Sequence, residues 1–248
     1  MPFLYQTFYN FRNIKNDTID LSNREVYFVG ENGQGKSNIL ESLYYSAYGS
    51  SFRTHTDSQI IKNGESNFSI NSLYSNEKEN IQHIKLIYDK GKKLIEKNGK
   101  RIHDRKELVN TIPCVLFCHS DMEFATGDPE CRRFFIDQSL TMYDSLYLDN
   151  LRNYKKVLKT RNLLLKESKY EMLDIYDLQL AQKGLEVQLK RKNAIFQFNE
   201  IFGKLYEEIS GVEGVTLEYI PSWKDIIEDV GKRFPKVEDI LNLLKEKR

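Results

Sequence analysis

The chain has 248 residues, of which 40% are hydrophobic and 29% are charged, and its formal net charge at pH 7 is +1. This length and composition predict a soluble globular protein with one large domain or two smaller ones. The net charge is too small for the protein as a whole to attract nucleic acid, so any nucleic-acid contact must be made by a local basic patch. No run of about 18 apolar residues predicts a membrane span, and residues 1–5 lack the basic start and apolar core of a signal peptide.

The three cysteines are an odd number and form no C-x-x-C pair, which argues against a disulfide framework and against a zinc ribbon. Cys114 and Cys118 have the even spacing that places two residues on one face of a strand, and we interpret them as small buried hydrophobic residues. This cysteine usage predicts a cytoplasmic protein.

Three strands are predicted before residue 30. Aromatic residues mark the first, residues 3–9, and a short strand near residues 18–21 follows a turn at Asn16 and Asp17. Residues 25–29 form an apolar, partly β-branched run that predicts a buried strand.

A glycine-rich loop directly follows that run and matches the phosphate-binding pattern G-x-x-x-x-G-K-[ST] at every fixed position. Glycines let successive backbone N–H groups turn inward around phosphates, the lysine adds a cation, and the serine hydroxyl is a ligand for Mg²⁺. Apolar residues at helical spacing over residues 37–47 predict that a helix follows, whose N-terminus favours anions. The pattern predicts an ATP and Mg²⁺ site, with Ser37 on the metal, rather than a chance turn; its residues are Gly30, Glu31, Asn32, Gly33, Gln34, Gly35, Lys36 and Ser37.

The helix is predicted to stop near Gly49, which can adopt the left-handed conformation of a C-terminal cap. A polar loop with one arginine, Arg53, comes next. Arg53 could face phosphate across the site or be an ordinary solvated loop residue, and the sequence favours neither.

Residues 56–110 are predicted to be rich in strands. Hydrophobic alternation marks residues 68–74 and 83–88, and Asn98-Gly99 predicts a hairpin turn. The stretch is rich in lysine, which fits either a DNA-backbone contact or the polar face of an exposed antiparallel sheet; we favour the sheet face.

A further buried strand is predicted at residues 112–118, and Asp128 before Pro129 predicts a helix start. Arg132 and Arg133 lie in the first turns of that helix, where cations are not locally favoured. They could bind an external anion, be plain solvated arginines, or pair with a carboxylate at Asp121, Glu123 or Asp137.

Residues 146–209 contain no proline and predict two helices with a break near residues 166–168. The seams are imperfect, so both a coiled-coil-like arm and a plain helical hairpin are consistent with them. We expect one more strand at residues 215–220 and a short amphipathic helix at 237–247. The expected seam residues are Tyr147, Leu151, Tyr154, Leu158, Asn162 and Leu165 in the first helix, and Leu178, Ala181, Leu185, Leu189, Ile195, Phe198, Phe202, Leu205 and Ile209 in the second.

Five stretches together resemble the RecF family of bacterial replication and repair ATPases. They are residues 10–14, the loop with residues 38–41, residues 49–54, residues 127–137, and Leu158 with Arg161-Asn162. The resemblance implies an α/β fold, in which a P-loop ABC-type ATPase head with a mixed sheet and helices carries an inserted antiparallel helical arm. It places the N-terminal lobe of the head at residues 1–145, the arm at 146–210 and an incomplete return toward the head at 211–248.

The resemblance also implies a function. Members of the family bind ATP, can form ATP-dependent homodimers, bind single-stranded or gapped DNA, act with RecR and RecO in loading recombinase, and take part in the SOS response. Weak ATPase activity is implied as well.

The chain departs from the family pattern at His119, Ala125 and Thr160. After residue 215 we find neither the acidic strand end that holds Mg²⁺ and polarises water nor a Ser-x-Gly-Gln loop, so we expect the second half of the head to be missing and identify no catalytic residue. Two alternative functions are a P-loop kinase acting on a small molecule and a truncated, non-catalytic fragment that binds a partner.

Overall fold

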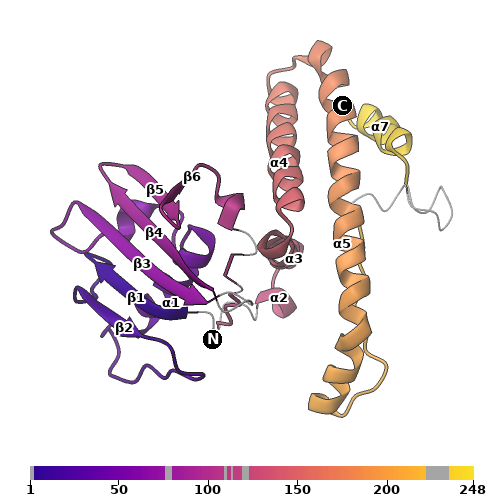
Figure 1. Ribbon diagram of the computed structural model, residues 1–248. Helices are drawn as coiled ribbons and strands as arrows, with labels where there is room; N and C mark the ends of the chain where they lie inside the picture. The colour runs from indigo at the N-terminus through magenta and orange to yellow at the C-terminus, as the bar shows by residue number, and fades with distance from the viewer. Residues whose placement is uncertain (1–2, 76–79, 109–110, 113, 119–122, 222–234) are drawn as a thin grey trace. The chain divides into compact units, whose positions relative to one another are not determined.

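The computed structural model describes residues 3–75, 80–108, 111–112, 114–118, 123–221 and 235–248. The chain divides into two compact units, Met1–His119 and Ser120–Arg248. The first unit contains the strands and the second is helical (Figure 1). None of the helices in the described ranges is both long enough and apolar enough to cross a bilayer.

The first unit is built on a six-stranded sheet in the order β2-β1-β3-β4-β5-β6. Every neighbouring pair of strands in this sheet is antiparallel. The strands are β1 (Phe3–Tyr9), β2 (Asp17–Asp20), β3 (Asn67–Ser75), β4 (Ile81–Asp89), β5 (Lys92–Lys97) and β6 (Lys100–Ile102), with 3-10 turns η1 (Asp57–Ile60) and η2 (Arg105–Leu108).

The predicted hairpin turn joins β5 and β6, and both of its residues are left-handed, with φ of 52° at Asn98 and 75° at Gly99. This is the backbone that makes Asn-Gly the preferred two-residue turn. On the outer face of the sheet, Asn71, Lys85, Glu96 and Arg101 lie opposite one another across four strands. The lysine-rich stretch thus forms strands with a polar outer face, as expected.

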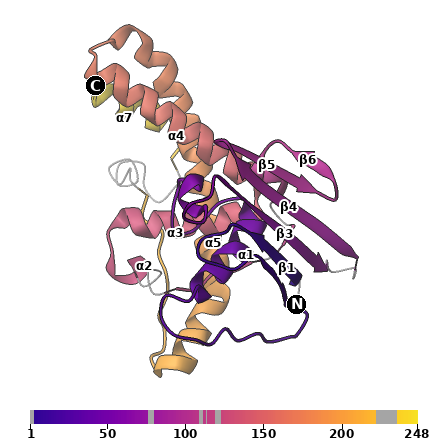
Figure 2. The same ribbon diagram turned by 90° about the vertical axis from the view of Figure 1, so that its left-hand side faces the viewer.

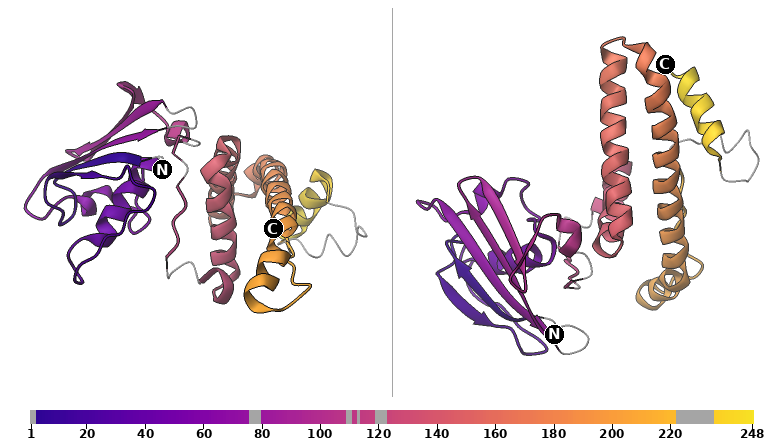
Figure 3. Two further views of the ribbon diagram at one scale, coloured as in Figure 1. Left: turned by 60° about the horizontal axis from the view of Figure 1, so that its bottom comes forward. Right: turned by 45° about the horizontal axis from the view of Figure 1, so that its top comes forward.

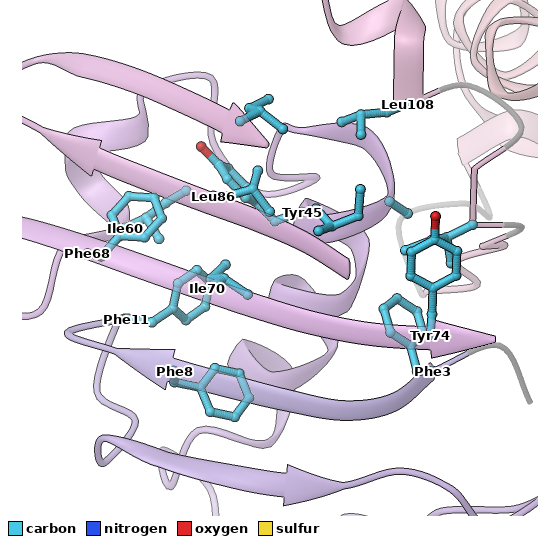
Figure 4. Packing of buried hydrophobic residues seen from close by; sticks show 14 of the residues in the cluster. Phe3, Phe8, Phe11, Tyr45, Ile60, Phe68, Ile70, Tyr74, Leu86 and Leu108 are labelled. Atoms are coloured by element: carbon cyan, nitrogen blue, oxygen red, sulfur yellow. The ribbon is translucent and has the colours of Figure 1, made fainter. Parts of the chain in front are cut away.

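The helix α1 (Lys36–Tyr48) covers the other face of the sheet (Figure 2). The core between them is aromatic and aliphatic, and burying such side chains is the main favourable term in folding. Phe8, Phe11, Phe68, Ile70 and Tyr45 are among its fully buried residues (Figure 4). As predicted, α1 ends at Gly49, whose φ is 63° and whose N–H donates to Tyr45 O.

A buried polar network fixes α1 to the sheet. The side-chain amide of Gln6 donates to the hydroxyls of Ser42 and Ser46, each at 3.2 Å, and Ser72 donates to Gln6 Oε1 at 2.6 Å. Each of these buried groups has a partner, so the network adds little desolvation cost and sets the position of the helix. It therefore also sets the position of the loop that precedes α1.

The three expected strands at residues 25–29, 112–118 and 215–220 are not strands in the described chain. Val29 and Val115 are 93% and 90% exposed. The prediction was wrong because apolar, β-branched sequence indicates suitability for a sheet, whereas a strand also needs a neighbour to pair with. Among the described residues, the 25–29 and 114–118 segments have no ladder partner.

In the second unit, α4 and α5 lie side by side as an antiparallel hairpin, and α7 packs on α5 (Figure 3). The helices are α2 (Glu123–Thr126), α3 (Pro129–Tyr143), α4 (Ser145–Lys166), α5 (Leu173–Ser210) and α7 (Val237–Glu246), with a 3-10 turn η4 (Tyr170–Met172). The predicted helix start at Asp128-Pro129, the break after Lys166 and the last helix are confirmed.

The seam of the hairpin matches the predicted one only in part, with Tyr147, Leu151 and Ala181 buried as expected. The expected seam residues Leu178 and Leu189 are 41% and 46% exposed, and Asn162 is exposed, whereas Arg161 is buried. A search for apolar residues at helical spacing does not find this seam, because the seam itself contains charged and small residues. The buried residues of α5 are Leu173, Asp177, Leu180, Ala181, Gly184, Val187, Gln188, Arg191 and Ala194.

Residues 215–220 run beside α5 rather than in a sheet. The side chain of Asn199 replaces a strand partner: its Nδ2 donates to Leu217 O at 2.8 Å and its Oδ1 accepts from Leu217 N at 2.9 Å. A Cβ at Gly203 would lie 3.3 Å from Val215 O, so this glycine permits the close approach.

Candidate nucleotide-binding site

The glycine-rich loop enters α1 through two left-handed glycines, Gly33 with φ of 83° and Gly35 with φ of 100°. Residues with a Cβ rarely adopt these angles. Nothing lies within 4 Å of the place where a Cβ on Gly33 would be, so the loop is open there. This open turn, at the N-terminus of a 13-residue helix, is a suitable place for an anion.

Lys36 folds back over the loop. Its Nζ donates to Gly30 O at 2.7 Å and to Glu31 O at 2.8 Å, so the ammonium is already held beside the loop backbone. The side chain of Ser37 is exposed in the first turn of α1. One cation and one exposed hydroxyl therefore lie at the junction of the glycine-rich loop and α1.

Side chains outside the loop hold it in shape. Asn13 Nδ2 donates to Gly33 O at 2.6 Å, and Asn38 Nδ2 donates to Asn13 Oδ1 at 2.7 Å. Arg53 Nη1 in turn donates to Asn38 Oδ1 at 2.6 Å. A Cβ on Gly35 would lie only 2.9 Å from Asn13 Oδ1, so Asn13 can approach because residue 35 is glycine.

The carboxylate of Glu41 lies next to this chain of hydrogen bonds and is fully buried. Arg12 binds it through two hydrogen bonds, from Nε at 3.0 Å and from Nη2 at 2.7 Å, in the forked geometry typical of arginine. Ser51 Oγ donates to it at 2.5 Å and Arg53 Nη1 lies 3.5 Å away. A buried carboxylate needs such partners to offset its desolvation.

Four of these side chains, those of Arg12, Asn13, Asn38 and Arg53, line a pocket of about 450 Å³. Three cations and one carboxylate lie in or beside it, which leaves an excess of positive charge. Arg12 and Asn10 hold the left-handed φ values of 51° and 50°, an uncommon backbone that is often found at functional sites. The lining residues are Arg12, Asn13, Asn38, Arg53, Ile61, Lys62 and Asn63.

The sequence left undecided whether Arg53 faces the site or is a solvated loop residue. In the structure Arg53 contacts Asn38 of α1, the helix that follows the loop. The structure adds four residues that sequence reasoning did not assign to the site: Arg12, Asn13, Asn38 and Glu41. They all lie in the first two family-like stretches, so the signal was present, but nothing in the sequence shows that these stretches meet.

The other arginines singled out in the sequence lie in the second unit. Arg132 and Arg133 are exposed on α3, and Arg132 Nη2 donates to Gly127 O at 3.2 Å. Asp137, one of their three expected partners, instead binds Arg191 of α5. Asp121 and His119 lie outside the described residues, as does the side chain of Glu123.

Within the described ranges, no three His, Cys, Asp or Glu side chains are grouped so as to hold a metal ion. The exposed hydroxyl of Ser37 fits a hard cation that takes most of its ligands from phosphate oxygens and water, as Mg²⁺ does. Burial raises the pKa of the Cys114 thiol to about 11, so this cysteine suits a packing role better than a metal site.

Comparison with known proteins gives a consistent result. The sequence pattern of the AAA domain family matches residues 7–248. The chain is 45% identical over 242 residues to the DNA replication and repair protein RecF of Treponema pallidum, and 37% identical over 221 residues to that of Clostridium perfringens. These alignments cover 96% and 88% of this chain, but 65% and 61% of the two relatives.

Solved structures agree with the sequence relatives. A structure of the recombination mediator protein RecF with ATP superposes with a TM-score of 0.81 at 26% identity, over 99% of this chain and 66% of that chain. A second structure, of RecF with ATPrS, superposes with a TM-score of 0.84 at 28% identity. The superposition covers 99% of this chain and 67% of that chain. The chain therefore spans about two thirds of the length of the proteins it matches.

Proposed function

The chain belongs to the RecF family, within the larger family of AAA domains, and we propose that it binds ATP at residues 30–37 and acts as a DNA replication and repair protein. The observation that carries the proposal is the loop itself. Two left-handed glycines open toward a helix N-terminus, with the Lys36 ammonium and the Ser37 hydroxyl beside them. The relatives are named replication and repair proteins, and two solved relatives contain ATP or an analogue.

In this proposal each side chain has a defined task. Lys36 leaves the Gly30 and Glu31 carbonyls and binds the outer phosphates, while the loop N–H groups bind the inner ones. Ser37 holds Mg²⁺, which neutralises phosphate charge. Arg12 and Arg53, kept in place by Glu41, add positive charge at the adjacent pocket. We assign nucleotide binding to these residues and assign no step of hydrolysis to any of them.

The partners proposed for the whole protein are those of the family. They are single-stranded or gapped DNA, RecR- and RecO-type repair proteins, and a second copy of the chain in an ATP-dependent homodimer. Recombinase loading, a part in the SOS response and a cytoplasmic location belong to the same proposal. It is supported by the names of the relatives and by two solved structures, both of which are described in the RecFOR pathway.

The test is nucleotide and DNA binding by the chain and by Lys36→Ala. Lys92→Ala, which removes an exposed charge at the start of β5, is the control. We expect Lys36→Ala to abolish ATP binding and the control to retain it. Unchanged ATP affinity in Lys36→Ala would refute the site.

The same proteins are then titrated with gapped DNA, with and without ATP, at two salt concentrations. DNA binding that needs both ATP and Lys36 would support a nucleotide-dependent repair protein. DNA affinity that is the same with and without ATP would mean that ATP binding and DNA binding are separate activities of the chain. DNA affinity that does not change with salt would exclude contact with the phosphate backbone.

A further inference from the structure

The charges on α4 are strongly one-sided. This helix contains a single acidic residue, Asp149, and residues 150–166 contain none. The neighbouring helix α5 mixes both signs along its length, with acidic residues at Asp174, Asp177, Glu186 and Glu200. The basic residues of α4 are Arg152, Lys155, Lys156, Lys159, Arg161 and Lys166.

Five of these six basic residues form one exposed stripe. With 100° between successive residues of an α-helix, Arg152, Lys155, Lys156, Lys159 and Lys166 fall within an arc of about 100°. The four lysines are exposed, and the Arg152 side chain is 38% exposed. We call these five residues the basic stripe.

The packed side of α4 is the opposite one. Its buried residues are Tyr147, Leu151, Arg161 and Leu164. The sixth cation, Arg161, belongs to that side, where its Nε lies 2.5 Å from Asp177 Oδ1. The packing of the arm therefore uses the one basic residue that is not in the stripe and leaves the stripe itself exposed.

The four lysines of the basic stripe are not neutralised within the described part of the molecule. Arg152 lies 3.6 Å from Asp149, and no ion pair is formed there by any of the four lysines. Lys155 and Lys159 are four residues apart, and Lys156 and Lys159 are three apart. Like charges at these spacings destabilise a helix, and an ordinary solvated helix alternates both signs instead. An external polyanion would remove this repulsion.

We propose that the basic stripe of α4 contacts the phosphate backbone of duplex DNA. The inference rests on the proposed function, from which it takes DNA as the partner, and it adds the surface that binds. At 1.5 Å per residue, Arg152 and Lys166 are about 21 Å apart along the helix, which corresponds to roughly six base pairs.

Duplex DNA fits this surface better than a single strand does. Proteins that bind single strands without sequence preference stack bases on aromatic side chains. The basic stripe contains no aromatic residue, and the tyrosines of α4, Tyr147 and Tyr154, lie on the packed side. Between Arg152 and Lys166, the one apolar residue within the arc is Leu163, which is 53% exposed. The surface therefore offers point charges for phosphates and no platform for bases.

The experiment compares two quadruple variants of the whole chain. In the first, the four lysines of the basic stripe become glutamine, which keeps a good helix propensity. The second variant is the control, and it removes four positive charges from exposed positions near the β4–β5 and β5–β6 turns. Both variants therefore have the same net charge. The substitutions are Lys155→Gln, Lys156→Gln, Lys159→Gln and Lys166→Gln in the stripe variant, and Lys90→Gln, Lys92→Gln, Lys100→Gln and Arg101→Gln in the control.

The measurement is fluorescence anisotropy with a short labelled duplex and with a single strand of the same length, over about 50–200 mM salt. We expect the stripe variant to bind the duplex at least about tenfold more weakly. We also expect its slope of log K against log salt to be smaller by about three to four, because each phosphate contact contributes about 0.9. Circular dichroism should show an unchanged helix content, since the removed charges repel one another.

The outcomes separate the two proposals. If the unaltered chain binds no duplex or single strand, DNA as partner fails, and the stripe assignment fails with it. If it binds DNA and the control variant loses affinity while the stripe variant does not, the stripe assignment alone is overturned. A larger loss on the single strand than on the duplex would also contradict the duplex assignment.

Discussion

Arg191 and Asp137 are 54 residues apart in the sequence and form a forked ion pair, with Nε to Oδ1 at 2.7 Å and Nη2 to Oδ2 at 2.8 Å. Tyr147 OH donates to the same carboxylate at 2.5 Å, so α3, α4 and α5 meet at one buried charge. Burial works against the charged form of Arg191, but its bonds to Asp137 outweigh this and raise its pKa. Burial, and then Asp137, likewise raise the pKa of Tyr147.

The first prediction concerns this pair. Asp137→Ala leaves the Arg191 guanidinium buried without its partner, and we expect a loss of about 3–5 kcal/mol in the free energy of unfolding. The double variant Asp137→Leu with Arg191→Met removes both charges and should be clearly more stable than the single one. Urea denaturation measures both. A double variant that is no more stable than Asp137→Ala would contradict the coupling.

The second prediction concerns Glu41. Its carboxylate is fully buried and binds Arg12, while the Arg12 side chain is 20% exposed. Glu41→Gln removes the anion between two arginines, and we expect a loss near the low end of the range for a broken buried pair, about 3 kcal/mol. Glu200→Gln, at an exposed position on α5, is the control and should change stability by less than about 0.5 kcal/mol.

The third prediction concerns the support of the loop by Asn13. Asn13→Ala removes the hydrogen bond to Gly33 O and leaves Asn38 without its acceptor. The loop then loses its shape before nucleotide arrives, and we expect ATP affinity to fall about five- to tenfold, as for one lost hydrogen bond. Calorimetric titration measures this, with the exposed Asn153→Ala as control. An unchanged affinity would show that the loop needs no support from Asn13.

The fourth prediction is a pH dependence at the start of α4. Asp144 is the N-cap of α4, accepting from Tyr147 N at 2.9 Å, and it pairs with Lys190 at 2.8 Å. Burial works against the charged form, but the hydrogen bond from Lys190 and those from the backbone outweigh it and lower the pKa of Asp144 below 3.8. A lowered pKa contributes stability that is present above the unfolded value and is lost as pH falls through the folded value.

Two variants separate the cap from the charge. Asp144→Asn keeps a good cap and should cost little at neutral pH, because Lys190 is 46% exposed. Asp144→Ala loses the cap as well and should cost about 1 kcal/mol. Below pH 3.8, the unfolding free energies of the unaltered chain and of Asp144→Asn should converge. A difference that persists in acid would contradict the assigned role of the charge.

The family-like stretches have separate tasks in the two units. In the first unit, Arg12, Glu41 and Arg53 come from three such stretches and meet in one ion-pair cluster beside the phosphate loop. In the second unit, Asp137 and Arg161 come from the other two, and each is half of a buried ion pair. These two residues therefore have a structural role in the second unit.

The sequence by itself determined the features that depend on neighbours in the chain. The phosphate loop with its helix, the Asn98-Gly99 turn, the helix start at Asp128-Pro129 and the cap at Gly49 are all set by local backbone preferences. A single sequence contains this information, because each of these residue types is favoured by the backbone angles of its own position.

Only the tertiary structure decided which charges are buried and which extended segments pair. Arg191 and Asp177 occupy the arm seam because Asp137 and Arg161 meet them from other helices, which no hydrophobic period reveals. Residues 25–29 look like a strand, but whether they pair depends on the availability of another strand. Burial of a charge and formation of a ladder are properties of two distant segments, so their energies are fixed only when both are in place.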